Sequence, residues 1–179
     1  MCHFITLIAP TENAAAVRAI MERHGRTASP IDNPSVRNAL RDGEHQFITT
    51  RGHCDCGTVL APRRDIPDTF EEKLAKESAR MKRKGWSEAK IARAVEDQRK
   101  ADARPDGGGS DSIELWTAVL RDLGEELRLP YIGLLVRFYS GAIATEAFTA
   151  TRRDVEKGMT RNEALASMEH DEVTIFRLN

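Results

Sequence analysis

The segment YIGLLVRFYSG, residues 131–141, constrains the fold more than any other, because its first half is an almost unbroken apolar run. Such a run predicts a strand in the middle of a sheet with both faces covered, since a strand with one wet face would alternate. Arg137 interrupts the run, and a charge among apolar residues needs a partner or a ligand. A structural ion pair with Glu146 is the expected arrangement.

Further strands are indicated where β-branched and aromatic residues cluster or alternate with polar ones. Residues 142–151 alternate enough to pair back on the central strand as a hairpin across Ser140 and Gly141. Residues 26–43 contain two prolines and Gly43, which predicts a loop with one short helical turn. The expected strands are residues 3–9, 45–50, 131–139, 142–151 and 171–178.

Helices are expected to flank this sheet. The first covers residues 11–25, with Thr11 as its N-cap and Gly25 as its stop. The second lies within residues 112–129, where apolar residues recur at helical spacing, and TRNEALASM predicts a shorter helix near the end of the chain. The expected fold class is therefore α+β, or mixed α/β, with a single sheet of about five strands and flanking helices.

A charged segment, residues 68–105, separates the two halves of this core and is expected to form an inserted pair of helices. Gly85 interrupts its first helix, and Ser87 can cap the second. The run DGGGSDS, residues 106–112, predicts a flexible hinge after the pair. The chain is thus expected to be a single domain over 1–179, with the helix pair as an arm.

Composition limits the partners and the compartment. The chain has 27 basic and 28 acidic side chains, so its formal net charge of -1 gives no overall attraction to DNA or anionic membranes. No apolar run is long enough to span a bilayer, and Pro10 comes too early for a signal peptide. The expected location is the cytoplasm, where the three cysteines would stay reduced.

The stretch RGHCDCGTVL contains histidine and cysteine, the usual zinc ligands, at His53, Cys54 and Cys56. With Cys2 these residues form a four-ligand candidate zinc site, and His3 is a further donor nearby. The relative direction of the first two expected strands decides whether these four residues can come together. If the strands at 3–9 and 45–50 are antiparallel neighbours, Cys2 lies beside the cysteine pair. If the intervening helix makes them a parallel β-α-β unit, Cys2 lies at the wrong end.

Two other interpretations of the same stretch stay open. Free cysteines often behave as small buried hydrophobes, and Gly52 and Gly57 would then simply turn the chain after a strand. The C-x-C spacing is less common in zinc sites than longer spacings, which favours this interpretation. The third possibility is a functional thiol pair. No cofactor is expected unless the cysteines hold zinc.

Cys2 is also a candidate by itself, because removal of Met1 would leave a terminal cysteine with a thiol beside an α-amine. The Met1-Cys2 opening resembles that of glutamine amidotransferases of the N-terminal-nucleophile type, and the resemblance implies a nucleophilic role for Cys2. In this chain His3 stands where the pattern has glycine.

The helix pair carries a compact basic cluster with an aromatic residue at its break, and a helix-turn-helix is one interpretation of it. No second, recognition helix follows at a short turn, and acidic residues interleave with the basic ones, so nucleic acid is not the expected partner. An exposed tryptophan among arginines is typical of a protein interface. The expected contact residues are Arg80, Arg83, Lys84, Trp86, Lys90 and Arg93.

The leading functional hypothesis is therefore a non-enzymatic, cytoplasmic protein-binding module of the adaptor or toxin-immunity type. Small bacterial immunity proteins resemble the chain in size and style, without a shared motif. No convergent catalytic set is apparent in the sequence, and no membrane partner is expected, whereas a homodimer is possible in principle. The alternative is a zinc- or thiol-dependent enzyme or sensor that uses Cys2, His53, Cys54 and Cys56.

Overall fold

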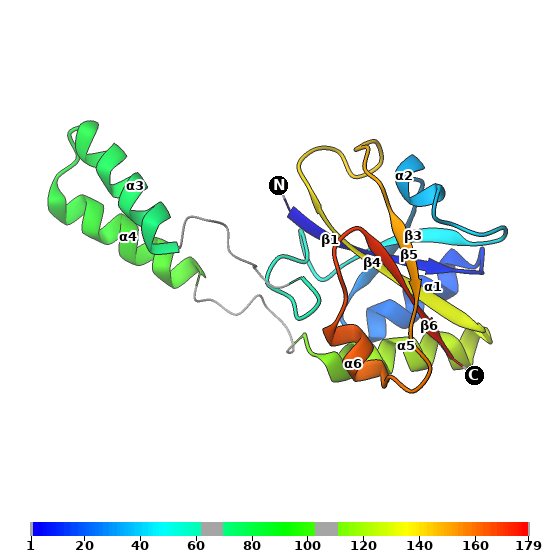
Figure 1. The fold of residues 1–179 in the computed structure, drawn as a ribbon. Helices are drawn as coiled ribbons and strands as arrows, with labels where there is room; N and C mark the ends of the chain where they lie inside the picture. Colours follow the sequence, from blue (N-terminus) through cyan, green and yellow to red (C-terminus); the bar gives the residue numbers. More distant parts are fainter. Residues whose placement is uncertain (1, 62–69, 103–110, 179) are drawn as a thin grey trace. The chain divides into compact units, whose positions relative to one another are not determined.

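The computed structural model describes residues 2–61, 70–102 and 111–178 (Figure 1). Contacts divide the chain into two compact units. The first, called the core unit here, comprises residues 1–62 and 110–179, and the second, the helical unit, comprises residues 63–109. The hinge predicted at 106–112 falls mostly outside the described residues, since only Asp111 and Ser112 belong to them.

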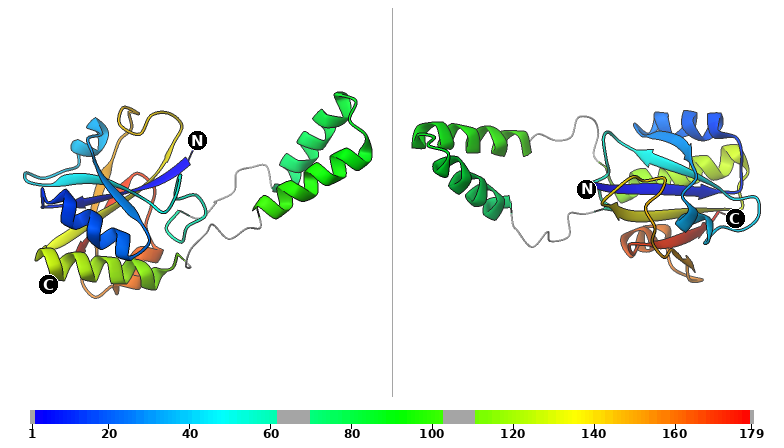
Figure 2. Two further views of the ribbon diagram at one scale, coloured as in Figure 1. Left: turned by 180° about the vertical axis from the view of Figure 1, so that it is seen from behind. Right: turned by 90° about the horizontal axis from the view of Figure 1, so that it is seen from above.

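One mixed sheet of six strands organises the core unit, in the order β2-β3-β1-β4-β6-β5 (Figures 1 and 2). Neighbouring strands are antiparallel except β5 and β6, which are parallel. The α+β class is confirmed, with six strands instead of about five. The strands are β1 (Cys2–Ala9), β2 (Thr27–Ile31), β3 (His45–Thr50), β4 (Tyr131–Tyr139), β5 (Thr151–Asp154) and β6 (Glu172–Arg177).

The central place predicted for the apolar run is confirmed, because β4 lies between β1 and β6. Leu134 and Leu135 point to opposite faces of the sheet, and both are completely buried. Leu134 belongs to the larger apolar cluster and Leu135 to the smaller one on the other side. Coverage of both faces explains why this strand does not alternate.

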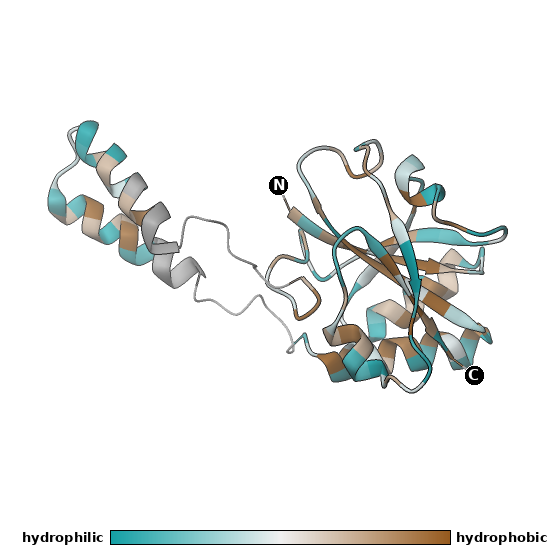
Figure 3. Cartoon of the chain, viewed as in Figure 1, coloured by the Kyte–Doolittle hydropathy of each residue, from teal (hydrophilic) through white to brown (hydrophobic). Residues whose placement is uncertain are grey.

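Helices cover the larger cluster. They include α1 (Ala14–Arg23), α5 (Ile113–Leu127) and α6 (Arg161–Ala166), whereas α2 (Pro34–Arg37) contributes to the smaller cluster. Figure 3 shows apolar residues along β1 and alternating polar and apolar positions on the helices. Helix α1 begins later than predicted, because Asn13 and not Thr11 is its N-cap and accepts a bond from the Ala16 N–H at 3.1 Å.

The helical unit contains α3 (Phe70–Arg83) and α4 (Glu88–Asp102), so the predicted helix, glycine break and second helix are confirmed. Gly85 has φ +79°, a left-handed backbone that glycine adopts without strain. Leu74 is buried, whereas Met81, Ile91 and Val95 are partly buried. In the part of the chain that the structure describes, no helix is both long and apolar enough to cross a membrane.

One correction concerns residues 26–43, which contain strand β2 as well as the predicted helical turn. Pro30 lies within β2 opposite Phe47 of β3. Proline is tolerated there because β2 is at the edge of the sheet, where a missing N–H costs no ladder bond on the outer side.

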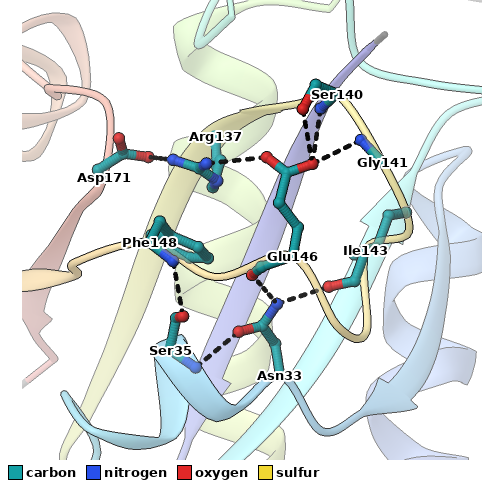
Figure 4. Close-up of polar contacts among 9 residues, drawn as sticks. All are labelled: Asn33, Ser35, Arg137, Ser140, Gly141, Ile143, Glu146, Phe148 and Asp171. Atoms are coloured by element: carbon teal, nitrogen blue, oxygen red, sulfur yellow. Dashed lines mark hydrogen bonds and ion pairs between the residues drawn. The ribbon is translucent and has the colours of Figure 1, made fainter.

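A second correction concerns the hairpin predicted for residues 142–151, which is wrong. Residues 140–150 form turns and a loop, and β5 starts at Thr151 and pairs with β6 instead of β4. Side chains satisfy the backbone of this loop (Figure 4). The Glu146 carboxylate accepts the Ser140 N–H at 2.8 Å, and the Asn33 amide donates to the carbonyl of Ile143 at 2.6 Å.

Candidate metal centre

The direction of β1 and β3 decides between the two arrangements open to the cysteines. The strands pair antiparallel, with Ile5 opposite Thr49 and Ala9 opposite His45, so the start of β1 lies beside the end of β3. The helix α1 does connect two strands that run the same way, but these are β1 and β2. Because β3 lies between them and runs back, the cysteine pair reaches the end of the sheet where Cys2 begins.

The cysteine loop, residues 51–61, continues the contact with β1 after β3 ends. The backbone N–H of Asp55 donates to the carbonyl of His3 at 2.8 Å, and the His3 N–H donates to Cys56 Sγ at 3.1 Å. The loop closes on itself through a bond from the Gly57 N–H to the Ala61 carbonyl at 3.0 Å. Backbone hydrogen bonds therefore hold the cysteine pair beside the start of β1.

Three sulfur atoms converge at this place. The Sγ atoms of Cys2, Cys54 and Cys56 all lie within 4.8 Å of one another, and all three residues are partly buried free thiols. Thiolates are soft ligands, which zinc and copper(I) prefer. The arrangement can therefore hold a soft metal ion with three sulfur ligands.

The two histidines of this region differ in their relation to the sulfurs. His53 is exposed and does not belong to the group that the structure brings together. His3 Nδ1 lies 3.6 Å from Cys56 Sγ, and its ring contacts the ring of His170 with centroids 5.0 Å apart. Of the four residues proposed as ligands from the sequence, the cysteines meet and the histidine does not.

The surroundings of Cys56 favour the protonated form of its thiol. Burial raises the pKa of the Cys56 thiol to about 11, with Cys54 and Cys2 adding to the rise and the His3 N–H opposing it. A protonated thiol is a poor nucleophile. Burial and the neighbouring His170 lower the pKa of His3, which favours its neutral form. Because the thiolate is both the nucleophile and the metal ligand, either chemistry requires Cys56 to lose this proton.

A buried polar network behind the cysteine loop was missed in the sequence. Arg26 and Asp55 are both completely buried and form an ion pair, and Arg26 Nη1 lies 3.3 Å from Asp111 Oδ1. The guanidinium also lies over the Trp116 ring, 4.4 Å from its centroid. Burial raises the pKa of Asp55 to about 6, and the neighbouring Arg26 opposes that rise. No local pattern marks these residues, because 26 to 111 is a long separation.

Arg137 forms the ion pair that its position in an apolar strand predicts. Its guanidinium lies 2.9 Å from Glu146 Oε1 and 2.8 Å from Asp171 Oδ1, and 3.9 Å from the ring centroid of Phe148 (Figure 4). The prediction is confirmed. Through Glu146 and Asp171, Arg137 connects β4 to the loop of residues 140–150 and to the residue directly before β6.

The residues proposed for partner binding all belong to the helical unit. Trp86 is 37% exposed at the turn between α3 and α4, and Lys90 Nζ lies 4.1 Å from its ring centroid. A groove of about 350 Å³ between the helices includes Ala79, Ile91 and Val95 among its lining residues. The proposed contact residues, all of them exposed, are Arg80, Arg83, Lys84, Trp86, Lys90 and Arg93.

Comparison with known proteins adds no assignment: the chain matches no protein-family model, and no curated protein or solved structure is found to be similar to it. A function for this protein must therefore be inferred from the geometry of the site.

Proposed function

We propose that this protein binds a soft metal ion through the thiolates of Cys2, Cys54 and Cys56. The observation that supports the proposal is that the sulfur atom of Cys2 lies within 4.8 Å of those of Cys54 and Cys56, which are more than fifty residues away in the sequence. Buried free cysteines do not need to meet in order to pack. Their meeting beside a backbone N–H that donates to sulfur favours a thiolate site over the interpretation as a simple glycine-flanked turn.

Zinc and copper(I) are the two ions that this donor set fits best. Zinc takes a fourth ligand, and a site with three protein ligands leaves one position for water or another molecule. Copper(I) is the alternative that thiolate ligands also favour. The number of sulfur and non-sulfur ligands, measured by X-ray absorption, distinguishes the two.

Native mass spectrometry tests the proposal directly. We expect one metal ion per chain after incubation with Zn²⁺, or with Cu⁺ under reducing conditions. Changing any one of the three cysteines to serine is expected to weaken binding by more than about 100-fold, which exceeds the loss typical of outer-shell changes. Saturation at 100 times Kd should stabilise the fold by about 2.7 kcal/mol.

His53→Ala is the matched control, because His53 is adjacent to Cys54 in sequence but is exposed and outside the group of sulfurs. It should bind metal like the wild type. A wild-type chain that takes up neither ion would contradict the proposal, and fast reaction of one thiol with an alkylating reagent would then favour thiol chemistry.

A second function, protein binding by the helical unit, is favoured by the exposure of Trp86 among basic side chains. Aromatic residues and arginines contribute most to many interfaces. We expect Trp86→Ala combined with Arg83→Glu to abolish capture of a partner from native lysate. Lys157→Glu, an equally exposed charge reversal on the core unit, should leave capture unchanged. Equal capture by all three proteins would exclude this surface as the interface.

A further inference from the structure

Arg26 lies behind the cysteine loop and has no solvent contact through its side chain. It lies in the turn between α1 and β2, directly before β2, and it bridges two carboxylates, Asp55 and Asp111. Burying a guanidinium requires good pairing, and replacing such a group by apolar side chains is often neutral or stabilising. A buried charge network at this position therefore suggests a role other than stability.

Asp55 connects Arg26 to the proposed metal ligands. It is the single residue between Cys54 and Cys56, and its Oδ2 atom accepts the Ile5 N–H at 3.0 Å. Its own N–H donates to the His3 carbonyl at 2.8 Å. Asp55 is thus attached to β1 at two points, on either side of Phe4. The ion pair with Arg26 holds its carboxylate in that orientation.

Asp111 supplies the other half of the bridge. Its Oδ2 atom accepts the Val59 N–H at 2.7 Å, while its Oδ1 atom faces Arg26. The cysteine loop is therefore held at Asp55 and again at Val59, and Arg26 contacts both of the carboxylates that make these attachments. Stacking on the Trp116 ring restricts the position of the Arg26 guanidinium between the two carboxylates.

We propose that Arg26 is a positioning residue of the metal centre, which through Asp55 and Asp111 holds the cysteine loop so that Cys54 and Cys56 face Cys2. This inference rests on the proposed metal-binding function. Outer-shell groups that orient ligands typically contribute 10- to 100-fold to metal affinity. The expected effect of losing Arg26 is therefore on affinity and on ligand geometry.

The experiment compares the full chain with Arg26→Met, Arg26→Lys and Arg152→Met. Affinity for Zn²⁺ is measured by chelator competition, and the geometry by the thiolate charge-transfer absorption of the Co²⁺ form. Arg152→Met is the matched control, because Arg152 is also a largely buried arginine paired with a buried carboxylate, Glu44, but it lies on β5 at the far edge of the sheet.

We expect Arg26→Met to bind Zn²⁺ 10- to 100-fold more weakly and to alter the Co²⁺ spectrum. Arg26→Lys keeps the charge beside Asp55 and should recover part of the affinity. Arg152→Met should lower stability without a change in affinity beyond twofold. If Arg26→Met does not fold, Asp55→Asn serves instead, since its amide oxygen can still accept the Ile5 N–H, while the charge and the oxygen that pair with Arg26 are lost.

The outcomes separate the two proposals. A wild type that binds metal, together with folded variants at Arg26 or Asp55 that bind it equally well, overturns the positioning role alone. A loss of affinity in Arg152→Met as large as in Arg26→Met also overturns it, because the effect would then follow stability. A wild type that binds no metal overturns the metal-binding function and this inference together.

Discussion

Glu44 shows at the scale of one residue how the core unit accommodates a buried charge. Its side chain has no exposure, and Arg152 donates to both of its oxygens at 2.7 and 2.8 Å. The backbone N–H of Arg41 donates to Oε2 at 2.7 Å. Burial by itself would raise the pKa of Glu44, but the hydrogen bonds from Arg152, the Arg41 backbone and Tyr131 together lower it.

A lowered pKa makes this pair a pH-dependent contribution to stability. Because the folded state holds the carboxylate more strongly than the unfolded state does, the contribution is present above the unfolded pKa near 4.5 and is lost as the pH falls through the lower folded pKa. We expect Glu44→Gln to lower the free energy of unfolding at pH 7 by about 3 kcal/mol. The loss should shrink on acidification.

Urea unfolding between pH 7 and pH 3 measures this effect. Glu156→Gln is the control, since Glu156 is exposed, and it should change the free energy of unfolding by less than about 0.5 kcal/mol at every pH. A wild type and a Glu44→Gln variant that differ by the same amount at pH 7 and pH 3 would contradict the assignment.

At the scale of elements, two glycines show how closely the strands and helices pack. A Cβ on Gly133 of β4 would meet Val173 Cγ1 and Ile175 Cδ1 at 3.0 Å and Ile8 Cβ at 3.2 Å. Side chains of two neighbouring strands therefore fill the space beside the glycine. A Cβ on Gly124 of α5 would meet Leu178 Cδ1 at 2.7 Å, the end of a flexible side chain near the end of the chain.

We expect Gly133→Ala to destabilise the fold by about 1 to 3 kcal/mol, because a central strand between packed neighbours cannot move aside. Gly124→Ala should cost less, since Leu178 Cδ1 can rotate away and alanine is the better helix former by about 1 kcal/mol, although Leu178 Cβ at 3.3 Å must also shift slightly. Equilibrium urea unfolding of both variants checks the difference. Equal losses at the two positions would show that the sheet yields as easily as the Leu178 side chain.

At the scale of the whole molecule, the proposed metal ligands and the proposed partner-binding residues belong to different compact units. All three cysteines belong to the core unit, and the helical unit contains Trp86 and the basic residues around it. The bond from the Val59 N–H to Asp111 joins the segments that precede and follow the insertion. The two proposed functions can therefore be separated by removing residues 63–109.

We expect a chain in which residues 63–109 are replaced by a short glycine-serine linker to fold and to bind metal with wild-type affinity. The reason is that the contacts of Cys2, Cys54 and Cys56 described above come from the core unit. Circular dichroism and native mass spectrometry provide the measurements. A folded deletion variant with much weaker metal binding would show that the helical unit contributes to the site.

The sequence by itself determined the elements whose signals are local. The apolar run of β4, the glycine break between α3 and α4 and the helical spacing of apolar residues in α5 all act within a few residues, so the α+β class follows from them. The ion pair between Arg137 and Glu146 could also be predicted from the sequence, because a charge in a buried strand requires a partner.

Only the tertiary structure decided what the cysteines can do. Strand direction depends on pairing between residues far apart, and the addition of β2 at the edge turned β3 antiparallel to β1 and brought Cys2 to the cysteine loop. The bridge from Arg26 to Asp55 and Asp111 is equally non-local, since burial of a charge becomes favourable only when its partners arrive from other elements. Composition and spacing identify the thiols, and the order of the strands brings them together.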